Sequence, residues 1–152
     1  MKPSLVACLA AVSLALAPPV AAQRRPPRPD ASVADDPVAR YDALLRAVVR
    51  ASGVDYAALR GRLPELVAFH AWLAEHGPTS TPTAYADAAS REAYWLNAYN
   101  ATVLRGVAEA PASMGNVLTY LPDNGFFRAR RWRVDGRERT LDEMENREVR
   151  EV

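Results

Sequence analysis

Two asparagines, Asn97 and Asn100, lie inside an almost continuous apolar run at residues 93–104. Together with Ala93 and Leu104 they follow the 3, 4 spacing of one helical face, so the run predicts a buried central helix with both amides turned inward. A buried amide without a hydrogen-bond partner costs about 1–3 kcal/mol. We therefore expect each asparagine either to hold neighbouring backbone in place or to line a binding site.

The segment 126–139 contains six arginines among three aromatic residues, Phe126, Phe127 and Trp132. Guanidinium groups pair with phosphates or carboxylates and aromatic rings stack on bases or sugars, so this pattern can bind a nucleic acid or an anionic glycan. Because the formal net charge of the chain is only +1, we expect no nucleic-acid partner. The same arginines could instead form the solvated face of a hairpin. The candidate anionic-ligand patch comprises Arg128, Arg130, Arg131 and Arg133.

Catalytic and metal-binding side chains are scarce. The two histidines, His70 and His76, are six residues apart, which differs from the i, i+4 spacing of a helical metal-binding pair. We expect His70 to be a hydrogen-bonded core residue and His76 to lie at a helix end, where a cation suits the dipole. Cys8 is the only cysteine, and no Gly-rich phosphate loop, nucleophile elbow or zinc-binding cysteine pair occurs. The sequence therefore predicts neither a metal site nor a cofactor.

Three helices are expected to precede the arginine-rich segment. Asp36 is a predicted N-cap for a helix that extends to Gly53, where a glycine suits the helix end. Pro64 opens a second amphipathic helix. Ser90 is expected to cap the central helix, and Pro111 terminates it.

A β-hairpin and a last helix are expected to follow. The Asp-Gly pair at residues 135–136 favours a two-residue type I′ turn between strands at residues 126–134 and 137–141. Thr140 and Glu143 then fit a capping box for a final helix. Together these elements predict an α+β fold that is mainly helical with one β-hairpin.

The N-terminus has the features of a signal peptide at residues 1–22. Lys2 precedes an apolar run at residues 5–17, which ends near small residues that suit signal peptidase. The run is shorter than the roughly 20 residues of a spanning helix. We therefore expect an exported protein, periplasmic or secreted, with no membrane span after cleavage. Residues 23–36 are rich in proline and arginine and predict a disordered linker before one domain at residues 37–152.

Four motifs occur in the order of the landmarks of a known family: residues 54–56 (VDY), 94–101 (YWLNAYNA), 126–127 (FF) and 140–145 (TLDEME). On these motifs, the chain from about Tyr41 onward resembles the domain-of-unknown-function 547 family, and the WLNAYN run is its most specific part. Members of that family continue past the LDEME helix into a segment with a histidine and a cysteine, and many have a histidine at the position of Asn146. The resemblance implies the family's helical scaffold in an incomplete domain.

The resemblance also groups the candidate site residues. Asp55 and Tyr56 are expected at the mouth between two helices, and Glu145 is expected near the inward edge of the last helix. A partly buried carboxylate is either paired or has a raised pKa, so Glu145 either bonds an arginine or Asn97, or acts as a catalytic acid or base. The candidate site, or buried polar cluster, comprises Asp55, Tyr56, Trp95, Asn97, Asn100 and Glu145.

Two interpretations of function remain open. In the first, the chain is a non-catalytic scaffold or binding module of the cell envelope, with a protein or an anionic envelope polymer as its partner. In the second, it is an incomplete copy of a papain- or transglutaminase-like hydrolase or acyl-transfer enzyme, whose catalytic cysteine and histidine the resemblance places beyond residue 152. Because Cys8 lies within the predicted signal peptide, the mature chain has no thiolate nucleophile, which favours the first interpretation.

Overall fold

The computed structural model describes residues 36–150, which belong to one compact unit of the chain. The first helix, α1 (Pro37–Val48), begins at Asp36, whose carboxylate accepts a hydrogen bond from the main-chain N–H of Val38 at 2.9 Å. A carboxylate in this position satisfies one of the free N–H groups of the first helical turn. The predicted start of this helix is therefore confirmed.

The chain turns after α1, so the prediction of a helix as far as Gly53 was wrong. Strands β1 (Val49–Arg50) and β2 (Gly53–Val54) pair antiparallel, and Gly53 has a φ angle of 133°, which other residues rarely adopt. The main-chain N–H of Asp55 bonds back to the carbonyl of Val48 at 2.8 Å. The glycine closes a tight turn between two strands, and this turn replaces the last part of the expected helix.

Two helices follow this turn. α2 (Tyr56–Arg60) is short, and α3 (Leu63–Glu75) carries Pro64 in its first turn, as predicted. α3 packs against α1, where the ring of Tyr41 stacks on that of Phe69 with centroids 4.0 Å apart. This aromatic stack joins the first helix to the centre of the unit.

The central helix, α4 (Ala88–Glu109), follows a short 3-10 helix, η2 (Pro82–Ala84). Its N-cap is Asp87, whose carboxylate accepts the main-chain N–H of Ser90 at 2.8 Å, so the prediction of Ser90 as the cap was wrong. The two alanines between these residues are strong helix formers and extend the helix by most of a turn. The helix ends before Pro111, as predicted.

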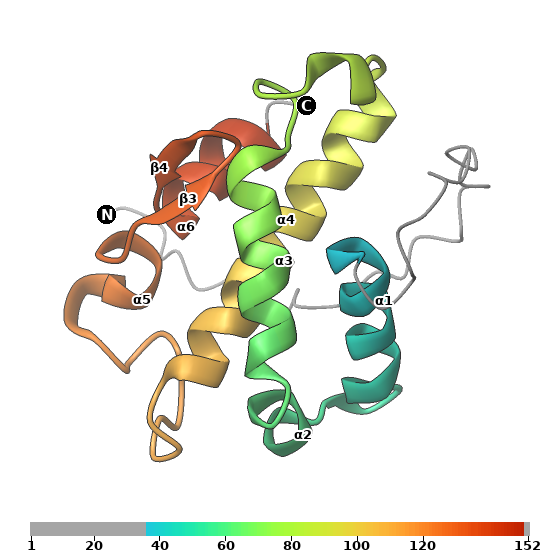
Figure 1. Cartoon of the computed structure of the whole chain (residues 1–152). Coiled ribbons are helices and arrows are strands. Elements are labelled where there is room, and N and C mark those ends of the chain that lie inside the picture. Colours follow the sequence, from blue (N-terminus) through green and yellow to red (C-terminus); the bar gives the residue numbers. More distant parts are fainter. Residues whose placement is uncertain (1–35, 151–152) are drawn as a thin grey trace. The chain divides into compact units, whose positions relative to one another are not determined.

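α3 and α4 cross at the centre of the described unit, with α1 on one side and the β3–β4 hairpin and α6 on the other (Figure 1). Ala98, Ala101 and Thr102 of α4 are fully buried, and these small side chains let the helices approach closely. Leucines from the surrounding helices fill the rest of the core. The fully buried ones are Leu44, Leu59, Leu66, Leu73 and Leu141.

The predicted hairpin is formed by β3 (Trp132–Val134) and β4 (Arg137–Arg139), which pair antiparallel. Asp135 and Gly136 have φ angles of 50° and 74°, as a two-residue type I′ turn requires. The predicted turn is therefore confirmed, although both strands are shorter than expected.

A helical turn replaces the beginning of the first predicted strand. η3 (Pro122–Asn124) is followed by α5 (Gly125–Arg128), so the expectation of a strand from Phe126 was wrong. Phe126 is buried against Gly106 of α4. The contact is so close that a Cβ atom added to Gly106 would lie 2.9 Å from the Cζ atom of Phe126. This tertiary contact outweighs the preference of aromatic residues for strands.

The final helix begins as α6 (Leu141–Glu143) and continues as a π-helix, η4 (Met144–Val149). The predicted capping box is confirmed, since the hydroxyl of Thr140 accepts the N–H of Glu143 at 3.1 Å and the Glu143 carboxylate accepts the N–H of Thr140 at 2.9 Å. The sequence predicted an ordinary helix in this place. The wider turn is a feature that the capping signal does not reveal.

The described part of the chain has a mainly helical α+β fold with two small antiparallel hairpins, as predicted, apart from the additional β1–β2 pair. The predicted signal peptide at residues 1–22 and residues 23–35 of the predicted linker lie outside the described residues. Within residues 36–150, no helix is both long enough and apolar enough to cross a membrane.

Candidate functional site

Asp55 and Tyr56 serve the local structure of α2. The Asp55 carboxylate accepts the main-chain N–H of Ala58 at 3.0 Å and is the N-cap of the helix. Tyr56 follows it and is 45% exposed. This capping role is a sufficient reason for an aspartate at position 55, without any catalytic role.

The prediction that Asn97 and Asn100 are buried was wrong. Asn97 is exposed and Asn100 is partly exposed. The inward stripe of α4 instead contains Ala98 and Ala101, each one position further along the helix. Because consecutive helical residues differ in direction by about 100°, this offset turns both amides away from the core.

Trp95 and Glu145 contact different partners. Trp95 is buried, and the guanidinium carbon of Arg139 lies 5.0 Å from the centroid of its ring. Glu145 accepts the hydroxyl of Tyr99 at 3.3 Å and pairs with Arg150 at 2.7 Å. The expected arginine pairing of Glu145 is therefore present. None of these contacts extends to Asp55, so they do not unite the six predicted residues in one site.

His70 is a hydrogen-bonded core residue, as predicted. Its Nε2 lies 2.9 Å from the hydroxyl oxygen of Thr102, and that hydroxyl donates to the carbonyl of Ala98 at 2.7 Å. Burial, assisted by the positive charge of Arg105, lowers the pKa of His70 to about 4. The imidazole is therefore neutral at physiological pH. Because the Thr102 hydroxyl donates to Ala98, the tautomer that fits has the proton on Nε2 and donates it to Thr102. His76 is at the end of α3, as expected, and its Nδ1 lies 2.9 Å from a main-chain carbonyl.

The predicted anionic-ligand patch is divided among separate ion pairs. Arg128 pairs with Asp142 at 3.3 Å, and Arg133 pairs with Glu75 at 3.6 Å. Arg130 pairs with Glu109 at 2.5 Å, while its guanidinium carbon lies 3.6 Å from the centroid of the Trp132 ring. Of the four predicted arginines, Arg131 alone lines the pocket described next.

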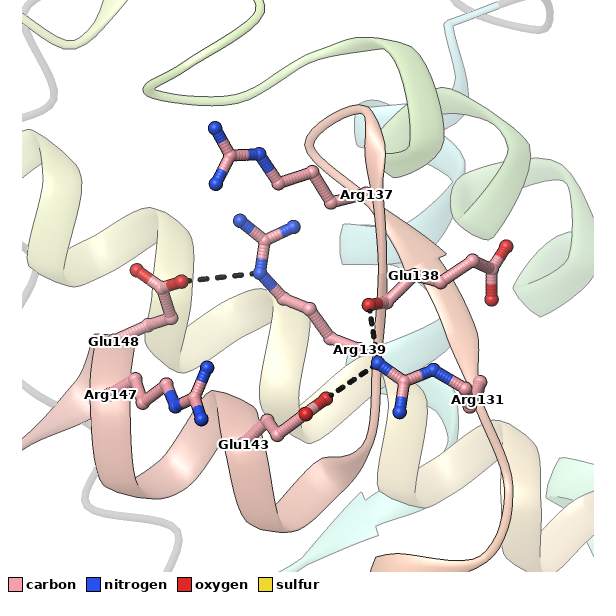
Figure 2. A pocket seen from close by; sticks show the side chains of 7 residues that line it. All are labelled: Arg131, Arg137, Glu138, Arg139, Glu143, Arg147 and Glu148. Carbon is pink, nitrogen blue, oxygen red and sulfur yellow. Dashed lines mark hydrogen bonds and ion pairs between the residues drawn. The ribbon is translucent and has the colours of Figure 1, made fainter.

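A pocket of about 150 Å³ lies between the hairpin and the final helix. Its walls combine four arginines with three glutamates, and Figure 2 shows these side chains around it. The lining residues are Arg131, Arg137, Glu138, Arg139, Glu143, Arg147 and Glu148. The pocket therefore presents converging guanidinium groups, which suit carboxylate and phosphate ligands.

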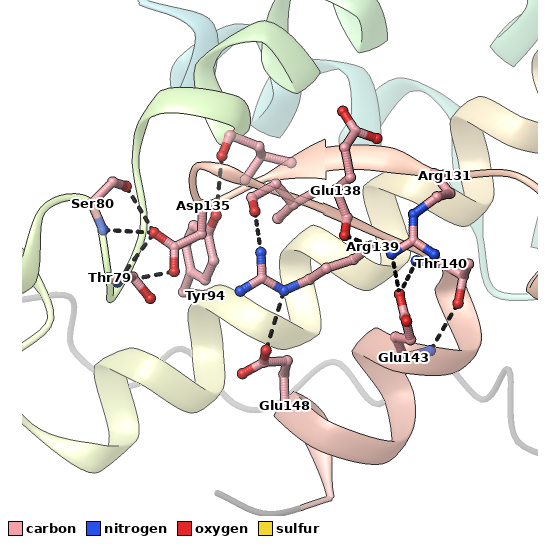
Figure 3. Close-up of polar contacts among 12 residues, drawn as sticks. Thr79, Ser80, Tyr94, Arg131, Asp135, Glu138, Arg139, Thr140, Glu143 and Glu148 are labelled. Carbon is pink, nitrogen blue, oxygen red and sulfur yellow. Dashed lines mark hydrogen bonds and ion pairs between the residues drawn. The ribbon is translucent and has the colours of Figure 1, made fainter.

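Two of these arginines are held firmly by protein partners. The Nε of Arg139 donates to Glu148 at 3.2 Å, and its Nη1 donates to the main-chain carbonyl of Val134 (Figure 3). Arg131 donates from Nη2 to the carbonyl of Glu138 at 2.9 Å and to the Glu143 carboxylate at 3.0 Å. These bonds fix both guanidinium groups before any ligand arrives.

The other two, Arg137 and Arg147, are exposed. Among the residues that the structure describes, neither forms an ion pair, although the charge of Arg147 helps to lower the pKa of Glu143. The largest cause of that lowered pKa is the hydrogen bond from the main chain of Thr140. Arg137 and Arg147 therefore have donors available for a ligand.

Sequence reasoning left Arg137, Arg139 and Arg147 out of the candidate site. A usable sequence signal existed for Arg137 and Arg139, because the register of an Asp-Gly hairpin places both residues on the same face of β4. No comparable signal existed for Arg147, whose direction depends on the π-helix. The most connected polar residue of the hairpin, Asp135, was also not identified.

Asp135 is the buried polar centre of the loop next to the pocket (Figure 3). Its carboxylate accepts hydrogen bonds from the main-chain N–H groups of Thr79 and Ser80 and from the Ser80 hydroxyl. Burial by itself raises the pKa of this carboxyl, but the hydrogen bonds from Thr79 and Ser80 outweigh it and the pKa lies below its ordinary value. Asp135 is thus a charged structural anchor.

A second, more apolar pocket of about 120 Å³ is lined by Phe126, Trp132 and Leu121, among others. Its carboxylate, Glu109, bonds Arg105 at 2.8 Å and Arg130 at 2.5 Å. Burial raises the pKa of Glu109, but the hydrogen bonds and charges of these two arginines together have a larger, opposite effect, so the pKa lies below its ordinary value. The charged groups of this pocket are therefore engaged with one another.

Within residues 36–150, no three His, Cys, Asp or Glu side chains are placed to hold a metal ion. No family model, curated protein or solved structure matches the chain. The arginine-lined pocket is accordingly the candidate functional site on its geometry alone.

Proposed function

We propose that the protein is an exported, non-catalytic binding module that recognises a negatively charged partner, such as an anionic polymer of the cell envelope. The observation that carries this proposal is the pocket in which the guanidinium groups of Arg137 and Arg147 lack carboxylate partners among the described residues. The proposed export rests on the signal-peptide pattern of residues 1–22. The proposed relationship to the domain-of-unknown-function 547 family rests on the motif at residues 94–101.

The chemistry of the buried polar groups supports a binding role. His70 and Thr102 are within hydrogen-bonding distance, as a catalytic base and its nucleophile would be. However, Thr102 is fully buried, and its hydroxyl donates its proton to a main-chain carbonyl. A nucleophile must reach its substrate and transfer its proton to the base. The pair instead serves as a bridge between α3 and α4.

The electrostatics of the pocket support an anionic partner. Arg131 and Arg139 are each matched by one glutamate, Glu143 and Glu148 respectively. Arg137 and Arg147 add positive charge that these carboxylates do not neutralise. Guanidinium groups at a partly enclosed surface attract anions more strongly than fully solvated ones, because screening by water is weaker there.

Binding to dextran sulfate, with uncharged dextran of the same length for comparison, tests the proposal. The purified full-length protein should bind the sulfated polymer and release it as the salt concentration rises. The double variant Arg137→Gln/Arg147→Gln should bind much more weakly. A matched double variant, Arg128→Gln/Arg133→Gln, removes the same charge outside the pocket and should bind nearly as the natural sequence does. Equal losses in both double variants would contradict a binding site in this pocket.

A further inference from the structure

We infer that the arginine-lined pocket holds a phosphomonoester-like dianion, namely a terminal phosphate group, with Arg137 and Arg147 as its principal ligands. This inference rests on the proposed function and names the chemical class of ligand. It follows from the charge balance of the pocket, from the directions of its donors, from its size and from the unusual helix that forms one wall.

The charge balance favours two negative charges on the ligand. Four arginines face the pocket, and two of them are paired with Glu143 and Glu148. The third glutamate, Glu138, lines the pocket, but Figure 2 shows its carboxylate directed away from the other side chains. The two positive charges of Arg137 and Arg147 therefore have no matching carboxylate among the described residues at the pocket, and a phosphate group carries close to two negative charges at neutral pH.

The donors approach from more than one direction. Arg137 belongs to β4, and Arg147 belongs to η4 on the opposite wall. Figure 2 shows their guanidinium groups on either side of that of Arg139. A phosphate presents three oxygens in a tetrahedral arrangement and can accept from several guanidinium groups at once, whereas a carboxylate presents two oxygens in one plane. The arrangement around the pocket suits the tetrahedral group better.

The size and fixed walls of the pocket fit a small group. A volume of about 150 Å³ holds several water molecules or one ligand group with a similar number of heavy atoms. Arg131 and Arg139 are fixed by carboxylates and main-chain carbonyls, so they define rigid walls. Arg137 and Arg147 are exposed side chains that can close on the group after it enters.

The π-helix provides a second, independent observation. In η4, the N–H of Arg150 bonds the carbonyl of Glu145 at 3.2 Å, five residues earlier. In this wider turn Glu148 lies on nearly the same side as Glu143, five residues earlier, and Arg147 also lines the pocket, whereas in an α-helix residues five apart differ in direction by about 140°. π-helical turns are rare and occur often at functional sites.

Calorimetric titration of the full-length protein with inorganic phosphate at low ionic strength and slightly alkaline pH tests the inference. We expect one site, with an affinity that falls as salt is added and a weaker response to malonate at equal ionic strength. Each single variant, Arg137→Gln or Arg147→Gln, should lower the phosphate affinity by about tenfold or more. The matched pair Arg128→Gln/Arg133→Gln should leave it within about twofold. Tighter binding of malonate, or equal losses in the two sets of variants, would overturn the inference.

Two further arms identify the source of the phosphate and separate this inference from the proposed function. Phosphatidylcholine vesicles with phosphatidic acid, set beside phosphatidylcholine alone, test for a lipid headgroup. Binding that requires phosphatidic acid and is lost in the Arg137 and Arg147 variants would assign the phosphate to lipid. If dextran sulfate bound through the pocket while neither phosphate source did, the proposed function would stand and this inference would fail. If none of the anions bound, both would fail.

Discussion

The carboxylate of Asp135 accepts a hydrogen bond from the main-chain N–H of Ser80 at 2.7 Å, across 55 residues of chain. The Ser80 hydroxyl donates to the same oxygen at 2.8 Å, and the N–H of Thr79 donates to the other oxygen at 2.9 Å. The main-chain N–H of Asp135 also donates to the carbonyl of Leu73, near the end of α3, at 2.8 Å. One turn residue therefore holds the hairpin against α3 and the following loop, and so positions the strand that forms one wall of the pocket.

The variant Asp135→Asn should destabilise the fold by about 2 kcal/mol. The amide replaces one acceptor oxygen by an NH2 group, which would face a main-chain donor of Thr79 or Ser80 and leave it unpaired. The change is measured as the difference in free energy of unfolding from urea melts. Asp42→Asn is the control, because its ion pair with Arg46 is largely exposed and should contribute less than about 1 kcal/mol. Equal losses in the two variants would contradict the anchoring role of Asp135.

Gly77→Ala should also destabilise this junction, by about 1–3 kcal/mol. A Cβ at Gly77 would lie 2.6 Å from the Cγ of Asp135, and the hydrogen bonds of that carboxylate prevent it from moving away freely. The control is Gly61→Ala, where the nearest atom to the new Cβ would be the carbonyl oxygen of Ala58 at 3.4 Å. Thermal melts of the two variants measure the difference. A tolerated alanine at position 77 would show that the close approach does not constrain the loop.

Local hydrogen bonding explains which elements could be predicted from the sequence. The Asp36 cap and the Thr140 capping box each join residues no more than three positions apart, so nearby sequence determines them. The turn at residues 135–136 is equally local. By contrast, α5 and η4 pack against the distant helix α4, as the contact of Phe126 with Gly106 shows. Propensity does not report such contacts.

The candidate site was harder to predict for a related reason. The apolar run at residues 93–104 is compatible with more than one inward face, and the small size of Ala98 and Ala101 decided which face packs against α3. The pocket collects Arg137 from a strand and Arg147 from a π-helix, so its composition follows from strand register and helix width together. The hairpin register could have placed Arg137, but no sequence motif indicates the direction of Arg147.

Asn97→Ala should change the free energy of unfolding by less than about 0.5 kcal/mol, because the side chain is exposed. A buried amide clamp would have cost about 1–3 kcal/mol. Thr102→Val provides the contrast within the same helix, since it keeps the shape of a fully buried residue but removes the hydroxyl that bonds His70. That variant should lose about 1–3 kcal/mol in urea melts. The opposite ranking would restore the clamp interpretation of Asn97.

Stability should fall as the pH decreases from about 6.5 to about 4, and His70 should account for this fall. Its pKa is about 4 in the folded protein against an ordinary value of 6.5, so between these limits the unfolded chain binds a proton that the folded protein does not. Protonation therefore favours unfolding as the pH falls. The difference between the two pKa values corresponds to about 3 kcal/mol of stability, fully present above pH 6.5.

The variant His70→Gln isolates this effect, because glutamine can still bond Thr102 but does not titrate. Its free energy of unfolding, measured in urea from pH 7 to pH 4.5, should change less with pH than that of the natural sequence, whatever its absolute stability. The carboxyls with lowered pKa values, Asp87, Asp135, Glu109 and Glu143, are present in both proteins, so the stability that they lose below about pH 5 is common to the two profiles and does not create the difference. Parallel pH profiles for the two proteins would show that the neutral state of His70 is not coupled to folding.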